Sequence, residues 1–147
     1  MNNKLPSIVL IGNPNSGKTA LFNRLTGLNQ KVSNYPGVTV EQKIGIAPIG
    51  HKKMQVIDLP GTYSLVPESH DEAIVADKFA QWAQGEDIPN CIISVVDSTN
   101  LERNLYLTSQ LIDLGIPIVI ALNMMDLSRE KSIDIDLEMF NLDIKEG

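Results

Sequence analysis

The chain has 147 residues, a length typical of a single domain, and its 43% hydrophobic and 20% charged residues are typical of a globular fold. Its formal net charge of −6 argues against binding to a nucleic-acid backbone, because such binding requires clustered lysine and arginine. No signal-peptide pattern opens the sequence, its apolar runs are too short to cross a bilayer, and its single cysteine excludes an internal disulfide.

Short apolar runs alternate with segments of helical periodicity along the chain. In chain order, we expect a strand at 8–11, a helix at 19–25, strands at 40–48 and 54–59, a helix at 71–82, a strand at 91–96, a helix at 101–114, a strand at 117–122 and a helix at 134–140. The turn at 50–52 predicts an antiparallel hairpin. This alternation predicts an α/β fold, with one antiparallel hairpin strand in a mostly parallel sheet and helices on both faces. The polar segments 28–39 and 60–69 are expected to be functional loops.

A phosphate-binding loop follows the first expected strand. Residues 12–19 read Gly-Asn-Pro-Asn-Ser-Gly-Lys-Thr, which fits the P-loop pattern between a strand and a helix. Glycines let successive N–H groups face one anion, and the helix amino terminus adds positive charge. We expect Lys18 to reach the β- and γ-phosphates and Thr19 to bind magnesium. The alternative, a chance glycine-rich turn, is disfavoured because pattern and context agree. The expected nucleotide contacts here are Gly12, Asn13, Pro14, Asn15, Ser16, Gly17, Lys18, Thr19 and Ala20.

An Asp-x-x-Gly segment ends the third expected strand. Asp58 would lie beside the phosphate site, where it could hold a magnesium-bound water, and the Gly61 amide could bond the γ-phosphate. Leu59 and Pro60 complete this segment of the expected nucleotide site. Alone, such a segment is a common turn, but it lies about forty residues after the phosphate loop and follows a hairpin.

Asn123-Met124-Met125-Asp126 follows the fifth expected strand. The Asp126 carboxylate could accept two hydrogen bonds from the donor pair of guanine, which adenine lacks. Asn123 would tie this segment to the phosphate loop. The alternative, that Asp126 merely caps a turn, stays open for the tetrapeptide alone.

Thr39 lies in the first long loop, after Gly37 and Val38. A threonine here could close over magnesium when a γ-phosphate is present and release it after hydrolysis, which would make the loop a switch. For Thr39 taken alone, a strand-edge threonine is the favoured interpretation. The strongest argument is the order of the four motifs, each at a strand end on one edge of the sheet.

These motifs in this order resemble the Ras-like GTPases. The runs at 13–19, 21–23, 37–41, 58–65, 100–107 and 122–126 are similar to FeoB, the bacterial ferrous iron transporter with an amino-terminal GTPase domain. The resemblance implies a P-loop NTPase fold of the G-domain type that binds GTP and GDP with Mg2+ and hydrolyses GTP. Met124 replaces the lysine of the wider superfamily, and a thioether can also pack on the base. Thr62 replaces the glutamine that orients water in Ras, so slow intrinsic hydrolysis is expected.

The resemblance also implies a potassium ion, held by Asn15 and by carbonyls near 34–36, that supplies the charge of an arginine finger. The expected catalytic residues are therefore Asn15, Lys18, Thr39 and Gly61, and the expected magnesium ligands are Thr19, Thr39 and Asp58.

The resemblance further implies that residues 1–147 are a G domain that ends before the fifth guanine motif, the helical domain and the membrane helices of the family. The expected partner is the membrane-embedded iron permease of the same full-length chain, at the cytoplasmic face of the bacterial inner membrane. Self-association through the switch loops is a further expectation, and no nucleic-acid partner is expected. Two alternatives are a ribosome-assembly GTPase, disfavoured by the acidic charge, and a P-loop ATPase or kinase, disfavoured by Asp126.

Overall fold

The structure is a computed structural model that describes residues 5–123. Its strands are β1 (Ser7–Gly12), β2 (Gln30–Asn34), β3 (Glu41–Ile49), β4 (Lys52–Asp58), β5 (Cys91–Asp97) and β6 (Ile118–Asn123). Its helices are α1 (Lys18–Thr26), α2 (His70–Ala83) and α3 (Leu101–Ile112), with a short 3-10 turn, η1 (Ser98–Asn100), before α3. The expected helix at 134–140 lies outside the described residues.

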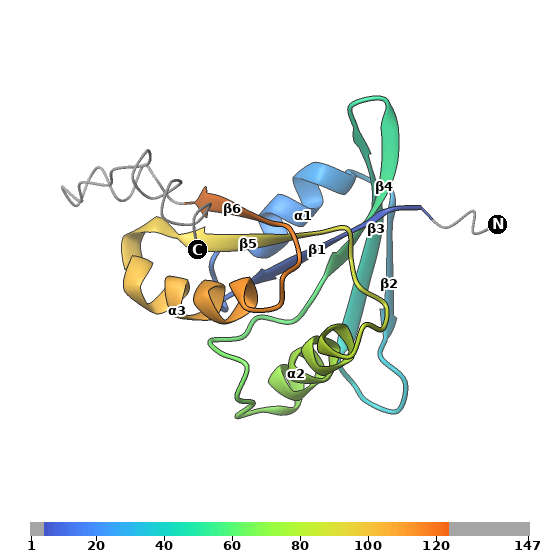
Figure 1. Ribbon diagram of the computed structural model, residues 1–147. Helices are drawn as coiled ribbons and strands as arrows, with labels where there is room; N and C mark the ends of the chain where they lie inside the picture. The colour runs from blue at the N-terminus through green and yellow to red at the C-terminus, as the bar shows by residue number, and fades with distance from the viewer. Residues whose placement is uncertain (1–4, 124–147) are drawn as a thin grey trace.

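One sheet organises these elements in the order β2-β3-β4-β1-β5-β6 (Figure 1). β4, β1, β5 and β6 pair in parallel, and β3 is antiparallel to both of its neighbours. Among the six strands within residues 5–123, only β3 runs against the others, in agreement with the predicted single antiparallel hairpin strand. The parallel strands bring Gly12, Asp58, Asp97 and Asn123 to the same edge of the sheet, because each of these residues ends its strand.

The two faces of the sheet bury separate cores. Ile8 and Leu10 of β1 face α1 and pack with Phe22, whereas Val9 and Ile11 face α2 and α3. Alternate residues of a strand point to opposite faces, so β1 is apolar throughout and lies buried between two helical layers. Figure 1 shows α1 on one side of the sheet and α2 and α3 on the other. Within residues 5–123, no helix is both long enough and apolar enough to cross a membrane.

The segment 28–39 was expected to be a loop, and this expectation is wrong for residues 30–34, which form β2. This strand pairs with β3 from Gln30↔Gly45 to Asn34↔Glu41. Its sequence, Gln-Lys-Val-Ser-Asn, lacks the apolar alternation by which a strand is recognised, and four of its five residues are exposed. Its ladder with β3 comes from tertiary context.

Candidate nucleotide-binding site

The loop between β1 and α1 has the curled backbone that a phosphate cradle requires. Asn15 and Gly17 have positive φ, 63° and 95°, and the Ser16 N–H donates to the Asn13 carbonyl over 3.2 Å. α1 begins directly after this turn, at Lys18. The amino terminus of the helix therefore faces the concave side of the loop, where it favours an anion.

Asn123, at the end of β6, holds the loop from behind. Its Nδ2 donates to the Ser16 carbonyl over 3.0 Å, which is the link expected from the sequence. A Cβ on Gly17 would lie 1.7 Å from that nitrogen. A side chain at Gly17 is therefore incompatible with the link, which joins the phosphate loop to the end of β6.

Lys18 and Asp58 form a buried ion pair. The Lys18 Nζ donates to Asp58 Oδ1, and the two side chains are 9% and 4% exposed. Asp58 ends β4, one strand away from the phosphate loop. The lysine expected to bind phosphate and the carboxylate expected to bind a cation therefore neutralise each other.

The segment after Asp58 is bonded to β1 at both ends. The Leu59 N–H donates to the Leu10 carbonyl over 3.3 Å, and the Thr62 N–H donates to the Gly12 carbonyl over 3.0 Å. Between them, a Cβ on Gly61 would lie 2.9 Å from backbone atoms of Pro14. Only glycine fits this approach, so the Gly61 amide is held beside the loop.

Two adjoining cavities collect most of the predicted residues. One, of about 430 Å3, is lined by Lys18, Thr19, Thr39, Asp58 and Gly61 among others. The second, of about 500 Å3, is lined by Asn13, Pro14, Asn15, Gly17, Lys18, Thr19, Ala20 and Gly61, with Asp71. The first combines hydroxyl and carboxylate oxygens, the ligands that Mg2+ prefers, with a lysine for phosphate. The donor set therefore fits a magnesium-bound nucleotide.

Other predicted residues lie apart. Gly37 and Val38 line a third hollow together with residues 34–36, so the carbonyls expected to complete a potassium shell do not share a cavity with Asn15. Gly12 and Ser16 belong to the phosphate loop but are buried, and within residues 5–123 the Ser16 hydroxyl has no hydrogen-bond partner. Met124 and Asp126 lie outside the described residues.

Glu72, in the first turn of α2, organises the loop at 60–69 and was missed by sequence reasoning. Its Oε2 accepts from the Thr62 hydroxyl over 2.9 Å and from the Tyr63 N–H over 3.3 Å, and its Oε1 accepts from the Glu68 N–H over 3.2 Å. Burial alone would raise the pKa of this carboxyl, but hydrogen bonds from Thr62, Tyr63, Glu68 and Ser69 outweigh it and lower the pKa. The Ser69 hydroxyl caps α2 by accepting from the Glu72 N–H, and the Ser-x-x-Glu pattern is a helix-start signal that can be read in the sequence.

Two further features lie around the site. Asp71 lines all three hollows near the phosphate loop and was also missed. From α3, the Arg103 guanidinium lies 3.9 Å from the centre of the Tyr63 ring, and Gln110 accepts from the Leu65 N–H over 3.0 Å. The loop at 60–69 is thus held by both α2 and α3.

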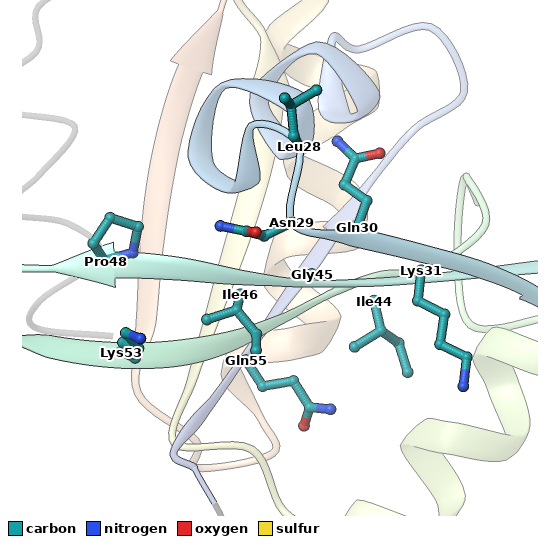
Figure 2. Close-up of a pocket in the computed structure, with 10 residues that line it drawn as sticks. All are labelled: Leu28, Asn29, Gln30, Lys31, Ile44, Gly45, Ile46, Pro48, Lys53 and Gln55. Atoms are coloured by element: carbon teal, nitrogen blue, oxygen red, sulfur yellow. The ribbon is translucent and has the colours of Figure 1, made fainter.

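A separate hollow of about 670 Å3 lies across β2, β3 and β4, away from the phosphate loop (Figure 2). Its floor includes Lys31, Ile44, Ile46 and Gln55, which lie on one face because Lys31 pairs with Ile44 and Ile46 with Gln55. Leu28, after α1, stands at its rim fully exposed. None of the predicted nucleotide-site residues lines this hollow.

A family model described as Ferrous iron transport protein B matches residues 6–145. This chain belongs to the FeoB family. It is 52% identical, over 134 residues, to the Fe(2+) transporter FeoB of Legionella pneumophila (strain Lens). The aligned region covers 88% of this chain and 17% of that protein. The chain therefore spans about a sixth of the length of this curated FeoB relative.

Solved FeoB structures share the fold. The cytosolic domain of L. pneumophila FeoB matches with a TM-score of 0.82 and 53% identity, over 90% of this chain and 51% of that one. A GDP-bound mutant of the S. thermophilus FeoB G-domain matches with a TM-score of 0.75 and 53% identity, over 86% and 46%. The predicted P-loop G-domain fold is confirmed, and FeoB membership disfavours the ribosome-assembly and ATPase or kinase alternatives.

Proposed function

We propose that this chain is the GTP-binding and GTP-hydrolysing switch domain of a bacterial ferrous iron transport protein. The observation that carries the proposal is that Lys18, Thr19, Thr39, Asp58 and Gly61 line the same cavity. Its similarity to the GDP-bound S. thermophilus FeoB G-domain supports the choice of a guanine nucleotide.

Each residue of this cavity has a distinct role. Lys18 exchanges Asp58 for the β- and γ-phosphates, and the Gly61 N–H donates to the γ-phosphate. Thr19, Asp58 and Thr39 provide the oxygen ligands that suit Mg2+, which when bound neutralises phosphate charge. Lys18→Ala is expected to lower nucleotide affinity at least tenfold, and equilibrium titration with a fluorescently labelled GDP measures this. Unchanged affinity would contradict the assignment.

Guanine selection rests on Asp126, with Met124 against the base. Asp126→Asn should shift preference from GTP toward XTP, because the extra carbonyl of xanthine accepts from an amide where guanine offers a donor. Competition of GTP, XTP and ATP against the fluorescent nucleotide tests this. Retention of the full preference for GTP over XTP would show that Asp126 does not read the base.

Hydrolysis is expected to be slow and activated by potassium. The Thr62 side chain, at the position of the Ras glutamine, is fully buried and bonds Glu72 and the Ser64 carbonyl, so it is not directed at a water on the γ-phosphate. Asn15, exposed in the phosphate loop, is the proposed potassium ligand, and carbonyls at 34–36 must move toward it. GTP turnover should be faster in potassium than in sodium, and the difference should vanish in Asn15→Ala. Equal rates in both salts would dismiss the idea.

The proposed partner is a membrane-embedded iron permease in the same full-length chain, at the cytoplasmic face of the bacterial inner membrane. The lengths of the curated relatives leave room for it, because this chain covers 17% of the L. pneumophila protein. Ferrous uptake by cells that carry Asp126→Asn in the full-length protein should respond to xanthine rather than guanine nucleotides. Self-association through the switch loops is proposed as well, and sedimentation with GDP and with a GTP analogue would reveal it.

A further inference from the structure

Tyr35 differs from its neighbours in the loop that joins β2 to β3. Pro36, Gly37, Val38 and Thr39 are all exposed, but the Tyr35 side chain is only 8% exposed and belongs to the core between the sheet and α2. This core also contains Leu59 and Val75. A single aromatic ring therefore attaches an otherwise solvent-exposed loop to the interior.

The backbone of Tyr35 also closes the turn that carries Thr39. The Tyr35 N–H donates to the Val40 carbonyl over 2.9 Å, and its carbonyl accepts from the Val38 N–H over 3.3 Å. Gly37, with φ of 77°, supplies the left-handed residue of this turn. Both ends of the turn are thus bonded at the point where the ring enters the core.

Thr39 lies between two spaces. It lines the cavity that contains Thr19 and Asp58, and it also lines a hollow of about 830 Å3 between the turn and the start of α2. Figure 1 shows the β2–β3 loop beside α2. The turn at 36–39 is exposed and borders open space beside the proposed cation site, whereas the Tyr35 side chain, at the edge of the same hollow, is buried in the core.

The Tyr35 hydroxyl takes no part in this attachment. It is buried, and no hydrogen-bond partner for it occurs within residues 5–123. Burial and the charge of Asp58 raise the pKa of Tyr35 to about 12, so the group stays neutral. A buried donor without a partner is destabilising, so the ring rather than the hydroxyl fixes the loop.

We propose that Tyr35 is a positioning residue for Thr39: its ring is the fixed pivot from which the turn at 36–39 carries the Thr39 hydroxyl to a cation beside Thr19 and Asp58. This inference rests on the proposed function, since it takes Thr39 as a magnesium ligand when a γ-phosphate is bound.

The test compares Tyr35→Ala, Tyr35→Phe and the control Tyr106→Ala, an exposed tyrosine on α3. Affinities for a non-hydrolysable GTP analogue and for GDP are measured over a range of Mg2+ concentrations. Tyr35→Ala should weaken analogue binding at least tenfold and raise the Mg2+ requirement, with GDP affinity within twofold of the starting protein. Tyr35→Phe should keep both affinities and unfold at a higher temperature, and the control should change neither affinity.

Equal loss of both nucleotides in Tyr35→Ala, or no loss of either, would overturn the inference, because a positioning role affects only the γ-phosphate state. A Phe variant as weak as the Ala variant would overturn it as well. Thr39→Ala separates the two proposals. If it binds the analogue normally, the proposed role of Thr39 fails. If it loses the analogue while Tyr35→Ala does not, only the Tyr35 inference fails.

Discussion

At the scale of single residues, two groups of the proposed site pair with each other. Lys18 and Asp58 are both buried and both charged. The desolvation cost of burying two charges is offset only by their mutual attraction and hydrogen bonding, so removal of either member leaves the other charge buried without compensation. The motif positions of both residues are readable from the sequence, but their pairing depends on β4 lying beside β1.

We therefore expect Asp58→Ala to lower the free energy of unfolding of the ligand-free chain by about 3–5 kcal/mol, because it leaves the Lys18 ammonium buried without a partner. The double variant Lys18→Met/Asp58→Leu should lose much less, since no charge stays buried. Urea unfolding followed by circular dichroism measures both, with the exposed Asp77→Ala as control. Equal losses in the single and double variants would show that burial of an unpaired charge is not the cause.

Gly17 offers a second residue-scale test. Gly17→Ala must adopt φ near 95° and must displace the Asn123 amide, so it should destabilise the chain by about 1–3 kcal/mol and abolish tight nucleotide binding. Gly27→Ala is the matched control, because its φ is also positive but nothing lies within 4 Å of the added Cβ. Fluorescent GDP titration and thermal unfolding distinguish them. If Gly27→Ala proves equally poor at binding, backbone strain rather than the Asn123 contact is responsible.

At the scale of elements, the sequence predicts what local pattern encodes. β1, β5 and α3 follow from apolar runs and helical spacing, and the hairpin of β3 and β4 from its turn. β2 could not be predicted, because Lys31, Ser33 and Asn34 give it no apolar face and its pairing with β3 is its main support. The segment 60–69 was correctly predicted as a loop, but the contacts with α2 and α3 that hold it could not be predicted.

Glu72 makes the order of that loop dependent on pH. Its pKa is lowered from 4.5, so its contribution to stability is fully present above that value and is lost as pH falls through the lower, folded-state pKa. Between pH 6 and pH 3.5, the starting protein should therefore lose more thermal stability than Glu72→Gln does. Glu68→Gln, an exposed neighbour in the loop, is the control and should lose as much as the starting protein. Parallel pH curves for all three would contradict the role of Glu72.

At the scale of the whole molecule, the two cores meet through one sheet, and the domain should unfold as a unit. Trp82, the single tryptophan, is 5% exposed and packs edge-on against Phe79 in the α2 core. Phe22, fully buried, lies on the opposite face. A change in the unfolding transition of Trp82 after mutation of Phe22 would therefore show that the sheet couples the two cores.

Phe22→Ala should lower the free energy of unfolding by about 3–5 kcal/mol, as expected for removal of a buried aromatic ring. Tryptophan emission and circular dichroism should report the same shifted midpoint, although the change is on the far face from Trp82. The exposed Val66→Ala should stay within about 0.5 kcal/mol of the starting protein. A Trp82 transition unaffected by Phe22→Ala would mean that the two cores unfold separately.

The ion pair of Lys18 and Asp58 has a thermodynamic consequence for ligand binding. If Asp58 and Lys18 have the proposed roles, a cation bound to Asp58 would free the Lys18 ammonium for a phosphate, and a phosphate bound to Lys18 would free the Asp58 carboxylate for a cation. Each ligand would then remove the cost of separating the ion pair for the other, so under the proposed roles the two should bind with positive heterotropic cooperativity. The factor by which magnesium raises the affinity for nucleotide must equal the factor by which nucleotide raises the affinity for magnesium.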